Sequence, residues 1–134
     1  MVKFAVCDDE KEMVDYISDK LHEYYPEECE IRKYTDGRSL LLDSCDEDFD
    51  ALFLDICMPN LDGMALAEKI REFNQYVKII FVTNNNELAY KGYLYDAFRY
   101  VRESRLEQEL CEAARSLSNY FVSLGEYLND RFII

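Results

Sequence analysis

The stretch Leu52–Gly63, with the sequence LFLDICMPNLDG, decides the fold of this chain. It begins inside a short apolar run, ALFL at 51–54, and that run is followed directly by a carboxylate at Asp55. Pro59 then ends any regular strand, because proline has no backbone N–H and restricts the residue before it. A buried strand that ends in an aspartate predicts a functional side chain at the carboxyl edge of a sheet.

The composition is that of one acidic globular domain. The chain has 134 residues, 49% of them hydrophobic and 32% charged, and a chain of this length forms a single core. Its 28 acidic and 15 basic residues give a formal net charge of −13, which opposes direct binding to nucleic acid or anionic lipid. The N-terminus lacks the apolar core of a signal peptide, and no run is long enough for a membrane helix. Five scattered cysteines predict reduced thiols in a cytoplasmic protein.

Strand patterns and helix patterns alternate along the chain. Short apolar or alternating runs predict strands at Val2–Cys7, Cys29–Tyr34, Ala51–Asp55, Val77–Val82 and Ala97–Val101. Apolar residues at helical spacing predict helices at Glu10–Tyr25, Arg38–Cys45, Met64–Phe73, Glu87–Tyr93 and Arg105–Asn129. Strands that alternate with helices form right-handed crossovers, so we expect an α/β fold with a parallel sheet covered on both faces.

Polar residues stand at the carboxyl ends of these strands. Asp8 and Asp9 follow the first strand, Asp55 ends the third, and Thr83 follows the fourth. Each has an ordinary structural explanation, such as a helix cap or a turn. Together, three carboxylates a few ångströms apart raise at least one pKa unless a cation joins them, and carboxylate oxygens suit Mg²⁺. With such a metal, one aspartate can accept a phosphoryl group as a nucleophile, and a hydroxyl can bond a phosphoryl oxygen.

In these motifs the chain resembles the receiver domain of bacterial two-component response regulators. The segments VCDDE, LFLDICMPNLDG, IIFVT and YLYDAFRYV come in that family's order and at about its spacing. The chain is most similar to the receivers of LytTR-type transcriptional regulators, which carry a DNA-binding domain after the receiver. The resemblance implies a flavodoxin-like, doubly wound (βα)5 fold with strand order 2-1-3-4-5 and an extended last helix. It also implies a receiver domain over residues 1–129, with 130–134 beginning a linker or a truncated DNA-binding domain.

The resemblance also assigns the chemistry. It makes Asp55 the phosphoacceptor and Asp9 a direct Mg²⁺ ligand, with Asp8 a ligand through water. The backbone carbonyl of Cys57 is implied as the third protein ligand, and Thr83 as the hydroxyl that follows the phosphoryl group. The chain would accept phosphoryl groups and would not act as a conventional enzyme.

Switching and partners follow from the same resemblance. Tyr100 matches an aromatic residue that turns inward on activation. The implied partners are a sensor histidine kinase and a second copy, bound through the face formed by the helix at 87–93, the strand at 97–101 and the last helix. DNA would bind only through a following domain, and no membrane partner is implied.

Two positions depart from the family pattern. The fifth strand usually ends in Lys-Pro, but this chain has Glu103 and Ser104 there, so the cation expected beside the phosphoryl group is missing. Arg102 is the nearest cation. Side chains alternate faces along a strand, so Arg102 reaches the site only if the strand end is shortened or twisted. Asn84 is larger than the residue usual beside the threonine and should narrow access to Asp55.

Two other interpretations stay open. An atypical receiver would keep the fold but switch by protein contact instead of phosphorylation, and the missing lysine favours it. A small phosphohydrolase of the haloacid dehalogenase type would need a second acid two residues after the nucleophile, where this chain has Cys57.

The last predicted helix carries a stripe of apolar residues that is longer than a five-stranded sheet can cover. Its members recur at alternating spacings of four and three over about three heptads: Leu106, Leu110, Ala113, Leu117, Tyr120, Leu124 and Tyr127. The surplus predicts either a dimer-forming extension or a linker into a following domain.

Overall fold

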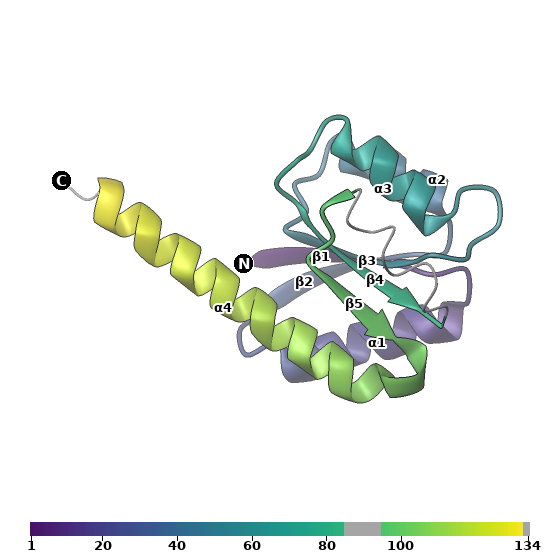
Figure 1. Cartoon of the computed structure of the whole chain (residues 1–134), viewed down its shortest axis with the longest axis horizontal. Coiled ribbons are helices and arrows are strands. Elements are labelled where there is room, and N and C mark those ends of the chain that lie inside the picture. Colours follow the sequence, from purple (N-terminus) through teal and green to yellow (C-terminus); the bar gives the residue numbers. More distant parts are fainter. Residues whose placement is uncertain (85–94, 133–134) are drawn as a thin grey trace.

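The computed structural model of the chain describes residues 1–84 and 95–132 (Figure 1). Its strands form one parallel sheet in the order β2-β1-β3-β4-β5, which confirms the predicted order. The strands are β1 (Val2–Cys7), β2 (Cys29–Tyr34), β3 (Ala51–Asp55), β4 (Lys78–Thr83) and β5 (Arg99–Arg102). The carboxyl ends of β1, β3, β4 and β5 therefore meet along one edge.

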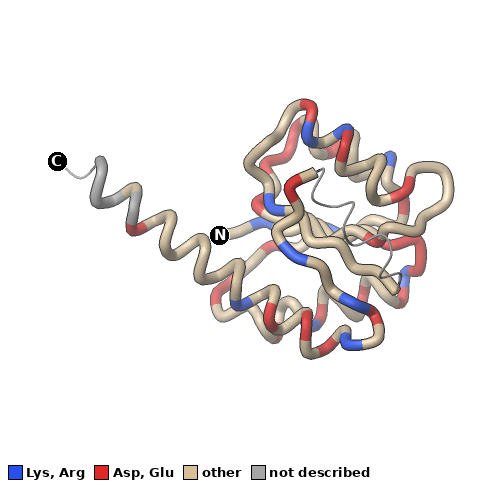
Figure 2. The backbone as a smooth tube through the Cα atoms, viewed as in Figure 1, with Lys and Arg blue, Asp and Glu red and all other residues tan. Residues whose placement is uncertain are grey.

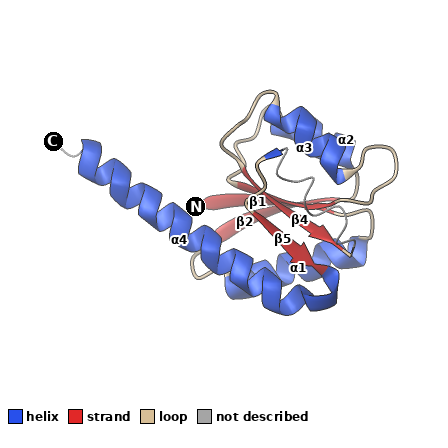
Figure 3. Ribbon diagram, in the orientation of Figure 1, coloured by secondary structure: helices blue, strands red, loops and turns tan. Residues whose placement is uncertain are grey.

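Helices cover both faces of the sheet (Figure 3). α1 (Lys11–Tyr24) and α4 (Leu106–Phe132) lie on one face, α2 (Gly37–Ser44) and α3 (Gly63–Arg71) lie on the other, and the short η2 (Glu103–Arg105) joins β5 to α4. The helix predicted at Glu87–Tyr93 lies outside the described residues. Within the described part of the chain, no helix combines the length and the hydropathy needed to cross a bilayer.

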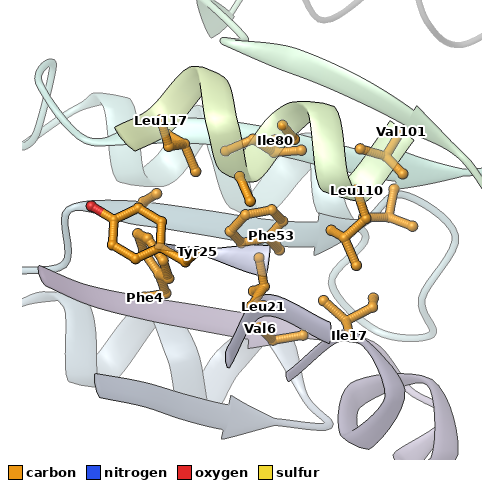
Figure 4. Close-up of a cluster of buried hydrophobic side chains, with 14 of the residues drawn as sticks. Phe4, Val6, Ile17, Leu21, Tyr25, Phe53, Ile80, Val101, Leu110 and Leu117 are labelled. Atoms are coloured by element: carbon orange, nitrogen blue, oxygen red, sulfur yellow. The ribbon is translucent and has the colours of Figure 1, made fainter. Parts of the chain in front are cut away.

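The first apolar core lies between the sheet and the pair α1 and α4 (Figure 4). Several of its large members are at most 1% exposed: Phe4, Phe53 and Ile80 from the strands, and Ile17, Leu21, Leu110 and Leu117 from the helices. Apolar side chains at spacings of three and four form one helical face, and this face is what holds both helices on the sheet.

The second core lies under α2 and α3. It contains Leu52, Leu54, Ile79 and Phe81 from the sheet, together with Leu40, Leu66 and Ile70 from the helices. All five residues of β3 are buried, as the run at 51–54 predicted for a central strand. Asp55 thus emerges from the most buried strand of the sheet.

The predicted boundaries of the described elements before β5 differ from the observed ones by at most two residues, and the differences are larger in the last helix. The strand expected from Ala97 begins at Arg99, although Phe98 already donates a backbone hydrogen bond to Ile79 at 2.7 Å. The last helix continues past the predicted end at Asn129, so residues 130–132 belong to α4.

Arg71 fixes the start of β5. Its guanidinium donates to the backbone carbonyls of Tyr95 at 2.8 Å, Val77 at 2.7 Å and Asp96 at 3.1 Å. A planar guanidinium is suited to several carbonyls at once. The contact ties the end of α3 to the strand that carries Tyr100.

Candidate functional site

Three carboxylates meet at the carboxyl edge of the sheet. Asp8 and Asp9 follow β1, Asp55 ends β3, and oxygens of all three lie within 4.8 Å of one another. Asp8 is 2% exposed and Asp55 is 9% exposed, whereas Asp9 is open to solvent. Local hydrogen bonds orient the two buried groups: the backbone N–H of Glu10 donates to Asp8 at 2.9 Å, and that of Cys57 donates to Asp55 at 3.3 Å. The convergence predicted from the strand ends is therefore present.

The loop after β3 holds Asp55 in place. Asn60 adopts a positive φ of 69°, a conformation that asparagine tolerates better than most residues, and Asp62 caps α3 by accepting from the Ala65 N–H at 2.8 Å. Gly63 donates to the carbonyl of Ile56 at 2.9 Å. The backbone of α3 thereby lies directly against the end of β3.

Gly63 is required by this close approach, and we expect Gly63→Ala to destabilise the chain by roughly 1 to 3 kcal/mol. A Cβ there would overlap the carbonyl oxygen of Asp55 and lie 2.9 Å from its carbonyl carbon, so the backbone itself would have to move. Urea denaturation followed by circular dichroism measures the effect. Gly125→Ala is the matched control, because a Cβ at that helical position meets nothing within 4 Å. It should instead stabilise by about 0.5 to 1 kcal/mol, and equal effects at the two glycines would contradict the argument.

The crowded carboxyls hold protons unusually tightly. Burial, followed by the charge of Asp8, raises the pKa of Asp55 to about 7, although the Cys57 N–H opposes this. Burial likewise raises the pKa of Asp8 to about 6, against the hydrogen bond from Glu10. A site with these properties is stabilised by any cation that neutralises its charge.

The donor set fits Mg²⁺. All three side chains offer hard carboxylate oxygens, and their mutual spacing allows one ion, or water bound to it, to contact each of them. No histidine or thiolate in the described residues competes as a softer ligand at this edge, since the pKa of the Cys57 thiol is raised by burial and by Asp55. The side chains present are thus of the type that binds magnesium in proteins.

The carboxylates line a cavity of about 160 Å³. Its lining consists of Asp8, Asp9, Glu10, Met13, Asp55, Cys57, Asn84 and Glu103. Asn84 therefore borders the approach to Asp55, and the narrower access expected from its size stays a prediction. Glu103 also faces this space, and burial and the charge of Glu10 raise its pKa. Among the described residues, this lining contains five carboxylates and no cation.

Arg102 does not supply the missing cation. Its guanidinium pairs with Glu109 of α4, at 2.6 Å from Nη2 and 2.9 Å from Nε to Oε2, and its backbone N–H also donates to Glu109 at 2.8 Å. Arg102 lies opposite Thr83 in the sheet register, but its side chain turns over the strand end toward α4. In this conformation the guanidinium of Arg102 lies outside the cavity, because Glu109 offers it a bidentate partner there.

The two predicted switch residues lie on neighbouring strands. Thr83 ends β4 at the same edge as Asp55, is 2% exposed, and does not contribute to the cavity lining. Tyr100 is half-buried on β5, and its ring stacks on Phe81 with centroids 5.6 Å apart. The backbone carbonyl of Cys57 stays a predicted metal ligand.

Two residues of this region carried no usable signal in the sequence. Glu109 holds Arg102 from the following helix, and nothing in the spacing distinguishes it from the other acids of α4. Met13 borders the cavity from α1, where its position looks like an ordinary helical core position. Tertiary contacts between separate elements decide both placements.

Known proteins share these features. The family model described as "Response regulator receiver domain" matches residues 4–115. Protein MrkE of Klebsiella pneumoniae is 31% identical over 88 residues, which cover 66% of this chain and 33% of MrkE. Transcriptional regulatory protein YpdB of Escherichia coli K12 is 35% identical over 80 residues, covering 57% of this chain and 33% of YpdB. The chain thus spans about a third of the length of these relatives.

Solved structures agree with the sequence matches. The response regulatory domain of MrkE superimposes with a TM-score of 0.82 at 27% identity, covering 91% of this chain and 99% of that one. The BeF3-activated DrrB receiver domain gives 0.75 at 25% identity, covering 87% and 97%. Because the family model spans most of the chain and the acidic edge occupies the end of the sheet, the chain belongs to the response regulator receiver domain family.

Proposed function

We propose that this receiver domain accepts a phosphoryl group on Asp55 from a sensor histidine kinase, with Mg²⁺, and thereby controls a LytTR-type transcriptional regulator. The observation that carries the proposal is the set of carboxylate oxygens from Asp8, Asp9 and Asp55 within 4.8 Å of one another. A nucleophile beside a divalent-cation site is the arrangement that phosphoryl transfer requires.

Asp55 is the nucleophile of this mechanism. One of its oxygens attacks phosphorus in line, and the bond between phosphorus and the imidazole nitrogen of the kinase breaks, with its electron pair returning to the nitrogen. Asp9 would hold Mg²⁺ directly and Asp8 through water, with the carbonyl of Cys57 as the third protein ligand. When bound, Mg²⁺ neutralises part of the phosphoryl charge. The Cys57 N–H, 3.3 Å from Asp55, helps to orient the carboxylate for attack.

The switch would use the strands beside Asp55. Thr83 would donate a hydrogen bond to a phosphoryl oxygen, which favours a position of the chain after β4 closer to the site. Tyr100, stacked on the buried Phe81, would be the aromatic group whose position follows this movement. Phosphorylation would then shift the population toward one arrangement of β5 and its neighbours.

The proposed partners extend the same mechanism. A second copy would bind through the face of the chain formed by residues 87–93, β5 and α4, and DNA would be bound by a following domain. The similarity to YpdB, a transcriptional regulatory protein that is about three times longer than the matched segment, supports a regulator of this kind. All five cysteines are free thiols, which fits the reducing cytoplasm.

An atypical receiver is the second candidate, and a specific observation favours it. Glu103 lines the cavity, and Arg102 is engaged by Glu109, so the described lining offers no cation for a phosphoryl group. In that case the chain would signal by protein contact alone, and Asp55→Asn would leave its self-association unchanged.

Incubation with a small phosphodonor and Mg²⁺ tests the proposed function. We expect intact-mass spectrometry to show the gain of one phosphoryl group in the native chain and none in Asp55→Asn, because the amide cannot act as the acceptor. A gain of equal size in the variant, or none in the native chain, would exclude Asp55 as the phosphoacceptor. Release of phosphate over many cycles per site would instead favour the phosphohydrolase interpretation.

A further inference from the structure

α4 is longer than the domain it covers. Its first half lies on the sheet through Leu110, Ala113, Ala114 and Leu117, all 0% exposed, whereas its second half projects past the sheet (Figure 1). The last firm contacts are made by Tyr120 and Phe121. The ring of Tyr120 lies 6.0 Å from that of Phe98 and 4.2 Å from the ammonium of Lys78, and Phe121 packs against the edge of the first core. We call the part of the helix after Tyr120, residues 121–132, the overhang.

Apolar residues continue into the overhang, with the register moved by one residue after Leu117. Phe121, Leu124 and Leu128 follow Leu117 at spacings of four, three and four. Phe121 is half-buried, but Leu124 is 40% exposed and Leu128 is 44% exposed. Two apolar positions in seven form the narrow seam by which one helix packs on another helix, and this is narrower than the face that packs on a sheet.

Charge is sparse along α4 from Leu117 to Leu128, although Asp130 and Arg131 stand near the end of the overhang. The chain carries a net charge of −13, yet Glu126 is the single charged residue between Ser116 and Leu128 (Figure 2). Glu126 lies about 200° around the helix from both Leu124 and Leu128, on the side away from the seam. Ser118, Tyr120 and Gly125, which flank the seam, are uncharged. Two copies of this acidic chain can therefore approach here without like charges facing each other, because such pairs would otherwise oppose association.

We infer that the overhang is a contact surface for a second copy of this chain, with Phe121, Leu124 and Leu128 forming the seam of a two-helix pair. Two-fold symmetry places Leu124, the middle residue of the seam, close to Leu124 of the second copy whichever way the helices run. Gly125 beside it adds no side chain that would hold the two helices apart. The seam spans fewer than two heptads, so the pair forms only at high protein concentration unless another contact joins the copies.

This surface is separate from the acidic edge and does not depend on Asp55. If the proposed function also holds, the overhang raises the effective concentration of the two domains, so phosphorylation needs to supply only the remaining part of the association free energy. Failure of phosphorylation would leave the overhang pair intact, and failure of the pair would leave phosphorylation intact. The two proposals are therefore tested independently.

Cysteine cross-linking tests the seam. In a chain with Cys45 and Cys57, its two exposed cysteines, replaced by serine, we would introduce Leu124→Cys or Glu126→Cys. Under a mild oxidant, Leu124→Cys should form the disulfide-linked dimer at least tenfold faster than Glu126→Cys, and the parent chain shows the background rate. Equal rates at the two positions, or no dimer at Leu124→Cys, would overturn the inference.

Sedimentation velocity provides a second measurement without new thiols. Leu124→Glu combined with Leu128→Glu should abolish self-association at concentrations where the native chain associates, because charges would face each other across the seam. Both leucines are exposed in the single chain, so the variant should keep its helical circular dichroism and its phosphoryl gain at Asp55. A native chain that stays monomeric at millimolar concentration, or a variant that associates equally, would also overturn the inference.

Discussion

Glu103→Lys is expected to increase the fraction of chain phosphorylated at Asp55 at least tenfold when the phosphodonor is limiting. The phosphoryl group brings two negative charges to a cavity that already holds five carboxylates and, in its described lining, no cation. The substitution changes the charge at this position from −1 to +1. Near a protein surface each unit charge at several ångströms contributes on the order of 1 to 2 kcal/mol, so a tenfold effect is at the low end. The phosphorylated fraction is measured by intact-mass spectrometry over a range of donor concentrations.

Glu103→Gln should give an intermediate increase, because it removes a charge without adding one. Glu68→Lys is the matched control: it makes the same charge change on the exposed side of α3 and should have little effect. If Glu103→Lys behaves like Glu68→Lys, the charge at position 103 does not limit phosphorylation. A gain that follows the series from glutamate through glutamine to lysine would show that the acceptor chemistry is intact and that this single position restrains it.

The convergence of the carboxylates could be predicted from the sequence because it depends only on strand ends. A parallel sheet brings the residues after β1 and β3 to one edge, and the apolar run before Asp55 already indicated a central strand. The alternation of strand and helix patterns also predicted the parallel sheet and its two helical layers, whereas the strand order was predicted from the resemblance to receiver domains. Local periodicity was sufficient wherever one face of an element is buried.

The direction of the side chains past β5 could not be predicted in this way. Alternation along a strand fixes a side chain only while the strand continues, and β5 ends at Arg102. The direction of the Arg102 side chain, toward the cavity or toward α4, depends on Glu109, which lies seven residues further along and has no sequence feature that sets it apart from the other acids of α4. Glu103, the next residue, lines the cavity at the place where a cation beside the phosphoryl group would be needed. Which side chain pairs with Arg102 is decided by how α4 packs beside β5, and a sequence pattern within one element does not show this.

Metal-free protein is expected to lose stability as the pH rises from about 4 to about 7. The pKa of Asp55 is raised to about 7 and that of Asp8 to about 6, so the folded chain binds these protons more tightly than the unfolded chain, whose carboxyls titrate near pH 4. Their contribution to the free energy of unfolding is thus fully present below about pH 4 and is lost as the pH rises through the folded pKa values. Asp55→Asn removes the Asp55 part of this loss.

We therefore expect Asp55→Asn to be more stable than the native chain by about 1 to 2 kcal/mol in EDTA near pH 8, which is less than the full pKa shift would give because the edge of the site is open to water. Thermal unfolding of the two proteins from about pH 4 to pH 8 measures the difference, and the acids elsewhere in the chain cancel in the comparison. Mg²⁺ should restore stability to the native chain near pH 8 and do so much less in the variant, because a ligand stabilises the state that binds it. Parallel pH curves would mean that Asp55 titrates normally in the fold. Equal gains with Mg²⁺ would mean that the ion binds without it, in which case the carboxylate cluster would not be the metal site.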